Sequence, residues 1–222
     1  MTAIRHERVS LVLHALRPGV GTPLLLLHAL GGSADEWSRE AVDWPGPVYA
    51  LDFSGHGGSA RVAGGAYTPE LLVGDADAAL ARLGTACVAG AGLGAWVALL
   101  LAGARPDHVP AALLLPGAGL AGGGAVPDYQ AAVSAEWIER TDVRLGHGGQ
   151  RTAGDPYLLL LEQDLRPVDY AEAFAARARR LLLAEDAVAR PPWWEAVAAS
   201  AAAERVPAGD LQAALARLAA AA

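Results

Sequence analysis

The run Gly90-Ala91-Gly92-Leu93-Gly94 joins a short apolar stretch to a helical pattern. Glycine is favoured where a strand turns sharply into a helix, because it tolerates unusual dihedral angles and close backbone packing. The first turn of a helix also carries unpaired N–H groups and the positive end of the helix dipole. We therefore expect the junction at Gly92 to be able to bind a carbonyl, a carboxylate or another anion through the main chain.

Two further segments concentrate glycine and polar residues directly after apolar runs. They are His28-Ala29-Leu30-Gly31-Gly32-Ser33 and Asp52-Phe53-Ser54-Gly55-His56-Gly57-Gly58-Ser59. In order and spacing, the three segments resemble the α/β-hydrolase superfamily. The first is similar to its His-Gly-x-Gly-Gly oxyanion loop and the second to its Asp-x-x-Gly-His-Gly-x-Ser segment. The run at Gly92 stands where the nucleophile elbow, Gly-x-Ser-x-Gly, belongs.

The resemblance implies three triad positions, and this sequence departs from the pattern at them. Gly92 stands at the nucleophile and Asp210 at the histidine. Strict alignment puts Ala187 at the acid, whereas a shift of one residue would put Asp186 there. The Ser-His-Asp mechanism needs an imidazole to take the hydroxyl proton. We therefore expect a degenerate triad without serine-hydrolase chemistry.

The resemblance also implies an oxyanion hole made by backbone N–H groups, here those of Leu30 and Leu93. Ala29 replaces the usual glycine of this loop. Trp137, with Tyr129 and Tyr157, is expected to form an apolar lid over the pocket. Ala29, Leu30, Leu93 and Trp137 are the predicted ligand-binding residues.

Other groups that could react are given structural roles. Cys87 is expected to be a buried, inert thiol. Ser33 lacks a positioned base and is not expected to be a nucleophile. His28 and His56 are expected to form hydrogen bonds that hold the two polar loops together.

The alternation of apolar runs and helical patterns predicts an α/β fold with a mostly parallel central sheet flanked by helices. The expected strands are residues 9–16, 23–28, 48–52, 86–89, 111–115, 180–184 and 203–206. The expected helices are residues 69–83, 95–104, 170–179 and 210–220, the first capped by Thr68 and ended by Gly84.

The chain of 222 residues is expected to form one domain, residues 1–222. The alternation breaks between about 118 and 165, which we interpret as a cap or lid insertion. Two amphipathic segments, 128–140 and 155–165, are expected within it.

Composition excludes several classes of protein. The net charge of −7 and the lack of basic runs argue against nucleic acid and anionic membranes as partners. The N-terminal residues do not form a signal peptide and no apolar run spans a bilayer, so a cytoplasmic protein is expected. We expect no metal and no cofactor. The Ala-rich last helix leaves a homodimer open.

Three functions are compatible with these residues. The first is a pseudoenzyme that binds a small apolar or carbonyl-containing molecule in the retained pocket. The second is a non-covalent cyclase, isomerase or lyase of small-molecule biosynthesis, with Asp210 or Asp186 as acid or base. The third is an atypical esterase or hydrolase. A dinucleotide site at Gly90-x-Gly92-x-x-Ala95 is disfavoured, because the following strand, 111–115, does not end in an acidic residue.

Overall fold

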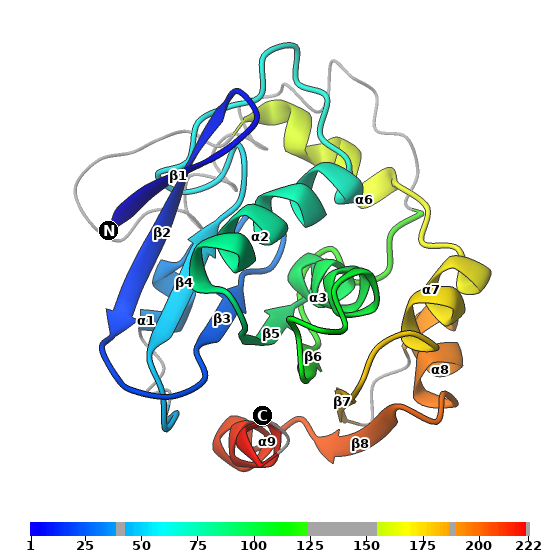
Figure 1. Ribbon diagram of the computed structural model, residues 1–222. Helices are drawn as coiled ribbons and strands as arrows, with labels where there is room; N and C mark the ends of the chain where they lie inside the picture. The colour runs from blue at the N-terminus through cyan, green and yellow to red at the C-terminus, as the bar shows by residue number, and fades with distance from the viewer. Residues whose placement is uncertain (39–42, 124–154, 187–189, 221–222) are drawn as a thin grey trace.

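The computed structural model describes residues 1–38, 43–123, 155–186 and 190–220 (Figure 1). Within them, one eight-stranded sheet has the order β1-β2-β4-β3-β5-β6-β7-β8. Its strands are β1 Thr2–His6, β2 Val9–Arg17, β3 Leu24–Leu27, β4 Val48–Asp52, β5 Cys87–Ala91, β6 Ala112–Leu115, β7 Leu181–Glu185 and β8 Ala203–Pro207. The pairs β1–β2 and β2–β4 are antiparallel and the other five are parallel. The predicted mostly parallel sheet is confirmed.

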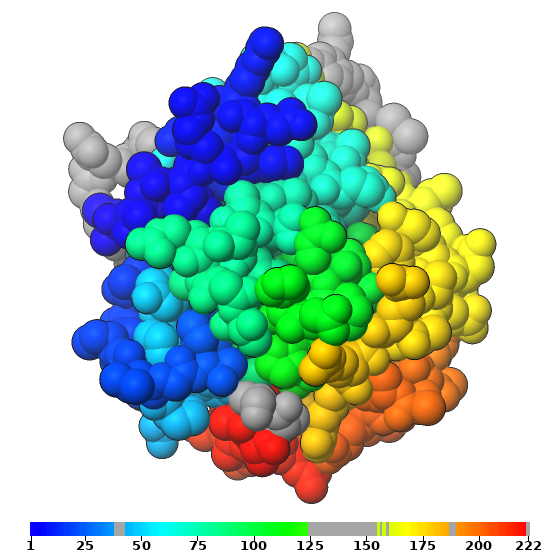
Figure 2. Space-filling view, in the orientation of Figure 1, coloured from blue at the N-terminus to red at the C-terminus, as the bar shows by residue number. Residues whose placement is uncertain are grey.

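Helices cover both faces of the sheet. They are α1 Asp35–Ser38, α2 Pro69–Leu83, α3 Leu93–Ala104, the 3-10 helix η1 Pro156–Leu159, α6 Leu160–Gln163, α7 Val168–Ala175, α8 Pro192–Ala198 and α9 Leu211–Ala219. The core on one side contains side chains of α2, α3, α7 and α8, and the core on the other contains side chains of α1 and α9. Figure 2 shows α2, α3 and α7 closing over the first side.

Strand β3 shows how the sequence divides these two cores. Its four leucines are fully buried and alternate in direction, as strand residues must. Leu25 and Leu27 join the core under α2 and α3, whereas Leu24 and Leu26 join the core under α1 and α9. A continuous apolar run therefore marks a central strand covered on both faces.

The predicted elements are found with shifts of one or two residues at most ends. The helix α2 matches its prediction at both ends, since the Thr68 hydroxyl accepts from the Leu71 N–H and Gly84 ends the helix with φ 85°. The third predicted helix, 170–179, lies earlier and is shorter, as α7. Strand β1 and helices α1 and α8 were not predicted. Only Ile4 is buried in β1, so this edge strand has little apolar signal.

The predicted insertion is described only in part. Residues 124–154, with Trp137 and the expected segment 128–140, lie outside the described residues. The other segment, expected as one helix over 155–165, is instead η1 followed by α6 and stops at Gln163. No helix among the described residues is long and apolar enough to cross a membrane.

Candidate active site

The turn from β5 into α3 places Gly92 at the carboxyl end of a central strand. Gly92 is the residue before α3, with φ 56° and ψ −118°, a combination that strains any residue bearing a side chain. The flanking glycines are needed for packing: a Cβ on Gly90 would lie 2.0 Å from the Gly94 oxygen, and one on Gly94 would lie 2.4 Å from the Leu27 oxygen. The interpretation of this run as a tight turn that requires small residues is confirmed.

The space beside Gly92 is filled by the chain itself. A Cβ at Gly92 would lie 2.1 Å from the Ala118 carbonyl oxygen and 2.6 Å from the Gly117 carbonyl carbon. These atoms are backbone and cannot move aside as a flexible side chain could. The loop after β6 therefore occupies the volume that a side chain at position 92 would need.

The carbonyl of Ala118 also accepts two hydrogen bonds from the turn. The Leu93 N–H donates to it at 2.9 Å and the Leu30 N–H at 3.2 Å. These are the two N–H groups predicted for an oxyanion hole, and the structure brings them to one point. That point holds an internal peptide carbonyl, so both donors already have partners.

The loop that carries Leu30 begins at His28 and is tied to the loop after β4. The His28 Nδ1 lies 2.7 Å from the Ala29 carbonyl oxygen, and its Nε2 accepts from the Phe53 N–H at 3.2 Å. His56 repeats the pattern, with Nδ1 3.0 Å from the Ser54 oxygen and Nε2 accepting from the Gly31 N–H at 3.4 Å. The predicted structural role of His28 and His56 is confirmed.

Both imidazoles are held neutral by this arrangement. Each ring must donate from Nδ1 and accept at Nε2, so a second proton would face a backbone N–H. Burial lowers the pKa of His28 and lowers that of His56 to about 3. Neither ring can therefore accept a proton as a general base while these hydrogen bonds persist.

Asp52 anchors the same loops from the end of β4. Its carboxylate accepts from the Ala34 N–H at 2.7 Å and the Gly58 N–H at 2.8 Å, and lies 2.9 Å from His14 Nε2. Burial alone would raise the pKa of Asp52, but these hydrogen bonds hold it below the ordinary value. The hydrogen bond to Asp52 raises the pKa of His14, and the pair has a structural role because it ties β2 to the end of β4.

Comparison with solved structures relates this arrangement to a known fold. The thioesterase domain from the curacin biosynthetic pathway is 17% identical and aligns over 99% of this chain and 98% of its own, with a TM-score of 0.70. The bottromycin epimerase, solved in complex with bottromycin A2, is 20% identical and aligns over 99% and 95%, with a TM-score of 0.64. The chain has the α/β-hydrolase fold.

Two curated proteins match part of the sequence. An esterase of Mycobacterium tuberculosis is 36% identical over 107 residues, 46% of this chain and 36% of its own length. The acetyltransferase component of the acetoin cleaving system of Pseudomonas putida is 36% identical over 108 residues, 45% of this chain and 28% of its own length. The matches thus span about a third of each relative. No protein-family model matches the sequence.

The two aspartates considered for the acid and histidine positions, Asp186 and Asp210, are exposed and have structural partners. The Asp210 carboxylate accepts from the Ala213 N–H at 2.9 Å and so caps helix α9. Asp186 pairs with Arg190 at 2.8 Å. Ala187 lies outside the described residues. Asp210 was proposed from the sequence as an acid or base, but in the structure its carboxylate accepts a hydrogen bond at the N-terminus of α9.

A cavity of about 220 Å³ lies beside the hydrolase elbow, on the side of the sheet covered by α1 and α9. It is lined by Glu36, Trp37, Ala91, Leu115, Pro116, Ala208 and Leu211. Ala91 and Pro116 directly precede Gly92 and Gly117, so the cavity adjoins the occupied hole. Among the described lining residues, Glu36 is the one with a charged side chain, and the walls combine apolar with polar surface.

The predicted ligand-binding residues do not line this cavity: Ala29, Leu30 and Leu93 are absent from its lining, and Trp137 lies outside the described residues.

The sequence also did not reveal the roles of Glu36 and Ala118. The Glu36 carboxylate turns back to the oxyanion loop, 3.5 Å from the Ala29 nitrogen. A single acidic residue in a short helix has no pattern that marks it. Ala118 contributes only its main chain, which no side-chain motif could disclose.

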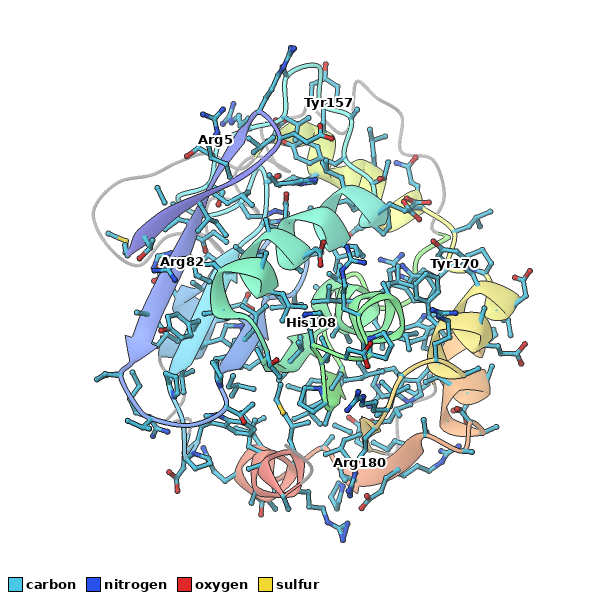
Figure 3. The ribbon with its side chains drawn as sticks, in the orientation of Figure 1. Arg5, Arg82, His108, Tyr157, Tyr170 and Arg180 are labelled. Atoms are coloured by element: carbon cyan, nitrogen blue, oxygen red, sulfur yellow. The ribbon has the colours of Figure 1, made fainter. Side chains whose placement is uncertain are left out.

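The remaining candidates behave as expected or lie elsewhere. Cys87 is fully buried, and burial raises its pKa to about 12, which confirms an inert thiol. The Ser33 hydroxyl accepts from the Asp35 N–H at 3.3 Å in the turn before α1. Tyr157, labelled in Figure 3, lies at the outer surface over Gly65 and does not line the cavity. The described residues contain no cluster suited to a metal ion.

Proposed function

We propose that this chain binds a small, mainly apolar organic molecule in the cavity beside the elbow and forms no covalent intermediate at position 92. The observation that carries the proposal is the Ala118 carbonyl, which accepts from Leu30 and Leu93 and fills the side-chain volume of residue 92. Covalent catalysis requires a nucleophile on this turn and an empty hole beside it. The mainly apolar cavity walls favour a ligand with little charge.

Binding can be tested with methyl benzoate, a small aromatic ester that matches the mainly apolar walls. We expect saturable NMR shifts of the methyl groups of Ala208 and Leu211 in the native protein. The Ala208→Leu variant should fill part of the cavity and abolish the shifts of the Leu211 methyl groups, which remain as the reporter in that variant. Ala201→Leu, at an exposed alanine outside the lining, is the matched control and should bind as the native chain does. Shifts that survive Ala208→Leu would contradict binding at this cavity.

A second function, non-covalent catalysis, is favoured by the Glu36 carboxylate on the cavity wall. There the carboxylate could take a proton from a bound substrate, or from a water molecule that attacks an ester carbonyl. The fold supports this candidate by analogy, since the structural relatives include an epimerase and a thioesterase domain. The sequence relatives include an esterase.

Turnover of 4-nitrophenyl butyrate separates the two functions. Catalysis by Glu36 predicts release of 4-nitrophenol by the native protein and a loss of at least about a hundredfold in Glu36→Gln, the usual contribution of a general base. Asp210→Asn should keep the native rate, because its side chain serves α9 instead. Absence of turnover with retained binding of methyl benzoate favours the binding protein.

A further inference from the structure

The loop after β6, whose Ala118 carbonyl occupies the oxyanion hole, is also held by hydrogen bonds at the residues that follow Ala118. The Arg166 Nη2 donates to the Gly119 carbonyl at 2.5 Å, and the Trp193 Nε1 donates to the Leu120 carbonyl at 3.1 Å. The Gly123 N–H donates to the Asp164 carbonyl at 3.0 Å. Three consecutive residues, 118–120, thus direct their carbonyl oxygens to donors, the first to the hole and the next two to Arg166 and Trp193.

Arg166 is an unusual residue for this place. Its side chain is nearly buried, at 7% exposure, and its hydrogen bonds within the described residues all go to backbone carbonyls. Its Nε is buried and has no hydrogen-bond partner in the part of the chain that the structure describes, and the guanidinium lies 5.8 Å from the Trp96 ring centre. Burial lowers the pKa of Arg166 to about 10, and the nearby carboxylates of Asp164 and Glu70 oppose this shift. The hydrogen bonds that the guanidinium makes within the described residues nevertheless go to backbone carbonyls, so the buried cation binds to the loop and to its own segment.

Trp193 donates the second side-chain hydrogen bond that holds this loop. It lies in α8, is 1% exposed and packs edge-on against Trp96 with ring centres 5.0 Å apart. Its indole N–H is satisfied by the Leu120 carbonyl, as a buried tryptophan requires. Arg166 and Trp193 therefore both lie against Trp96, and both donate to the loop.

Glycines let the loop pass between the hole and this cluster. Gly119 has φ 76°, and a Cβ there would lie 2.7 Å from the Leu30 Cβ. Gly122 has φ 64°, and a Cβ there would lie 2.3 Å from the Arg166 Nη1. The loop thus contacts the oxyanion loop on one side and the arginine on the other, with no room for a side chain at Gly119 or Gly122.

We propose that Arg166 and Trp193 are positioning residues that hold the Ala118 carbonyl in the hole and thereby close it. Neither residue contacts Gly92, Leu30 or Leu93 through its hydrogen bonds. They act through the backbone of 118–120, so the state of the hole is set from α8 and the segment between α6 and α7. This inference concerns the loop alone and does not depend on which ligand the cavity takes.

Amide hydrogen exchange at Leu30 and Leu93 measures this closure directly, since exchange requires each N–H to leave the Ala118 carbonyl. Trp193→Phe keeps the ring and removes the indole donor. Arg166→Met removes all the guanidinium donors, and Arg166→Lys retains one cationic donor. We expect exchange at both amides to rise about tenfold in Trp193→Phe and more in Arg166→Met, with partial recovery in Arg166→Lys.

The control is Trp44→Phe, because Trp44 is equally buried and its Nε1 donates to the Thr22 carbonyl at 2.8 Å, away from the loop. Amides of β3 and β5 report global opening in every variant. Faster exchange at Leu30 and Leu93 relative to those strands, absent in Trp44→Phe, supports the proposal. Exchange at Leu30 and Leu93 that changes only in step with β3 and β5 would overturn it, since that pattern reports general stability.

Discussion

The carbonyl oxygen of Ala118 lies 2.9 Å from the backbone nitrogen of Leu93 and accepts its N–H. In the α/β-hydrolase fold this N–H is the one that would face a developing oxyanion. Here it already has a partner 25 residues later in the chain. The hydrogen-bonding capacity of the site is retained, but an internal peptide uses it.

Gly92→Ala tests the space beside the elbow. We expect a loss of about 2–4 kcal/mol in the free energy of unfolding, from backbone strain and from overlap with the Ala118 carbonyl. Chemical denaturation measures it. Gly64→Ala is the control, because Gly64 also has positive φ, 85°, but a Cβ added there would have no atom within 4 Å. Equal losses in the two variants would show that the space at position 92 is open.

Gly92→Ser should not create a serine hydrolase. The hydroxyl would enter volume held by residues 117 and 118, and neither His28 nor His56 has a ring nitrogen that is free to take its proton. We expect no burst of 4-nitrophenol and no acyl adduct with 4-nitrophenyl butyrate. A stoichiometric burst in Gly92→Ser that is absent from the native chain would contradict this.

The buried histidines predict acid sensitivity. The folded pKa of His56, about 3, lies below the ordinary value of 6.5, so the unfolded chain binds a proton that the folded chain does not. Stability should therefore fall as the pH drops below 6.5. Between pH 6.5 and 5, His56 alone should cost about 2 kcal/mol, measured by urea denaturation at each pH.

His56→Gln is the matching variant for this pH dependence. Its stability should vary less between pH 6.5 and 5 than that of the native chain, whatever its absolute value, because one titrating group is gone. An unchanged slope would mean that His56 is already accessible to protons in the folded state.

For His14 we expect a pH dependence of stability with the opposite sign. Its hydrogen bond to Asp52 raises its pKa in the folded state, so its contribution is complete below pH 6.5 and is lost as the pH rises through the folded value. We expect His14→Gln to lose about 1 kcal/mol more at pH 5.5 than at pH 8.5. A loss that is equal at the two pH values would exclude an ionic His14–Asp52 pair.

Two variants of Asp210 distinguish a helix-capping role from a catalytic role. Asp210→Ala should cost about 1 kcal/mol of stability, and Asp210→Asn close to nothing, because asparagine also caps helices well. Thermal and chemical denaturation measure both. If Asp210→Asn lost turnover or ligand binding while keeping its stability, the carboxylate would have a role beyond α9.

Much of the fold was predictable because its signals are local. Fully apolar strands such as Leu24–Leu27, and the helix cap at Thr68, can be recognised from the residues that form them. The elbow at Gly92 was predictable for the same reason. Strand β1 was missed because only one of its side chains is buried, and α8 because Pro191, Pro192 and two tryptophans are more typical of a loop.

The sequence could not show that the oxyanion hole is occupied by a carbonyl of the chain itself, and the reason is physical. The hole is closed by a backbone carbonyl, and every non-proline residue carries the same main-chain groups. Its position depends on Arg166 and Trp193, which are distant in sequence from Leu30 and Leu93. Such long-range main-chain contacts leave no characteristic spacing in the sequence.

We propose above all that this α/β-hydrolase fold carries out no covalent chemistry at its elbow. Intact-mass spectrometry after incubation with a fluorophosphonate probe tests it most directly, with an active serine esterase labelled in parallel as the positive control. We predict an unchanged mass for the native chain. Stoichiometric addition of one probe molecule at this site, for example at Ser33 of the oxyanion loop, would contradict the absence of covalent chemistry.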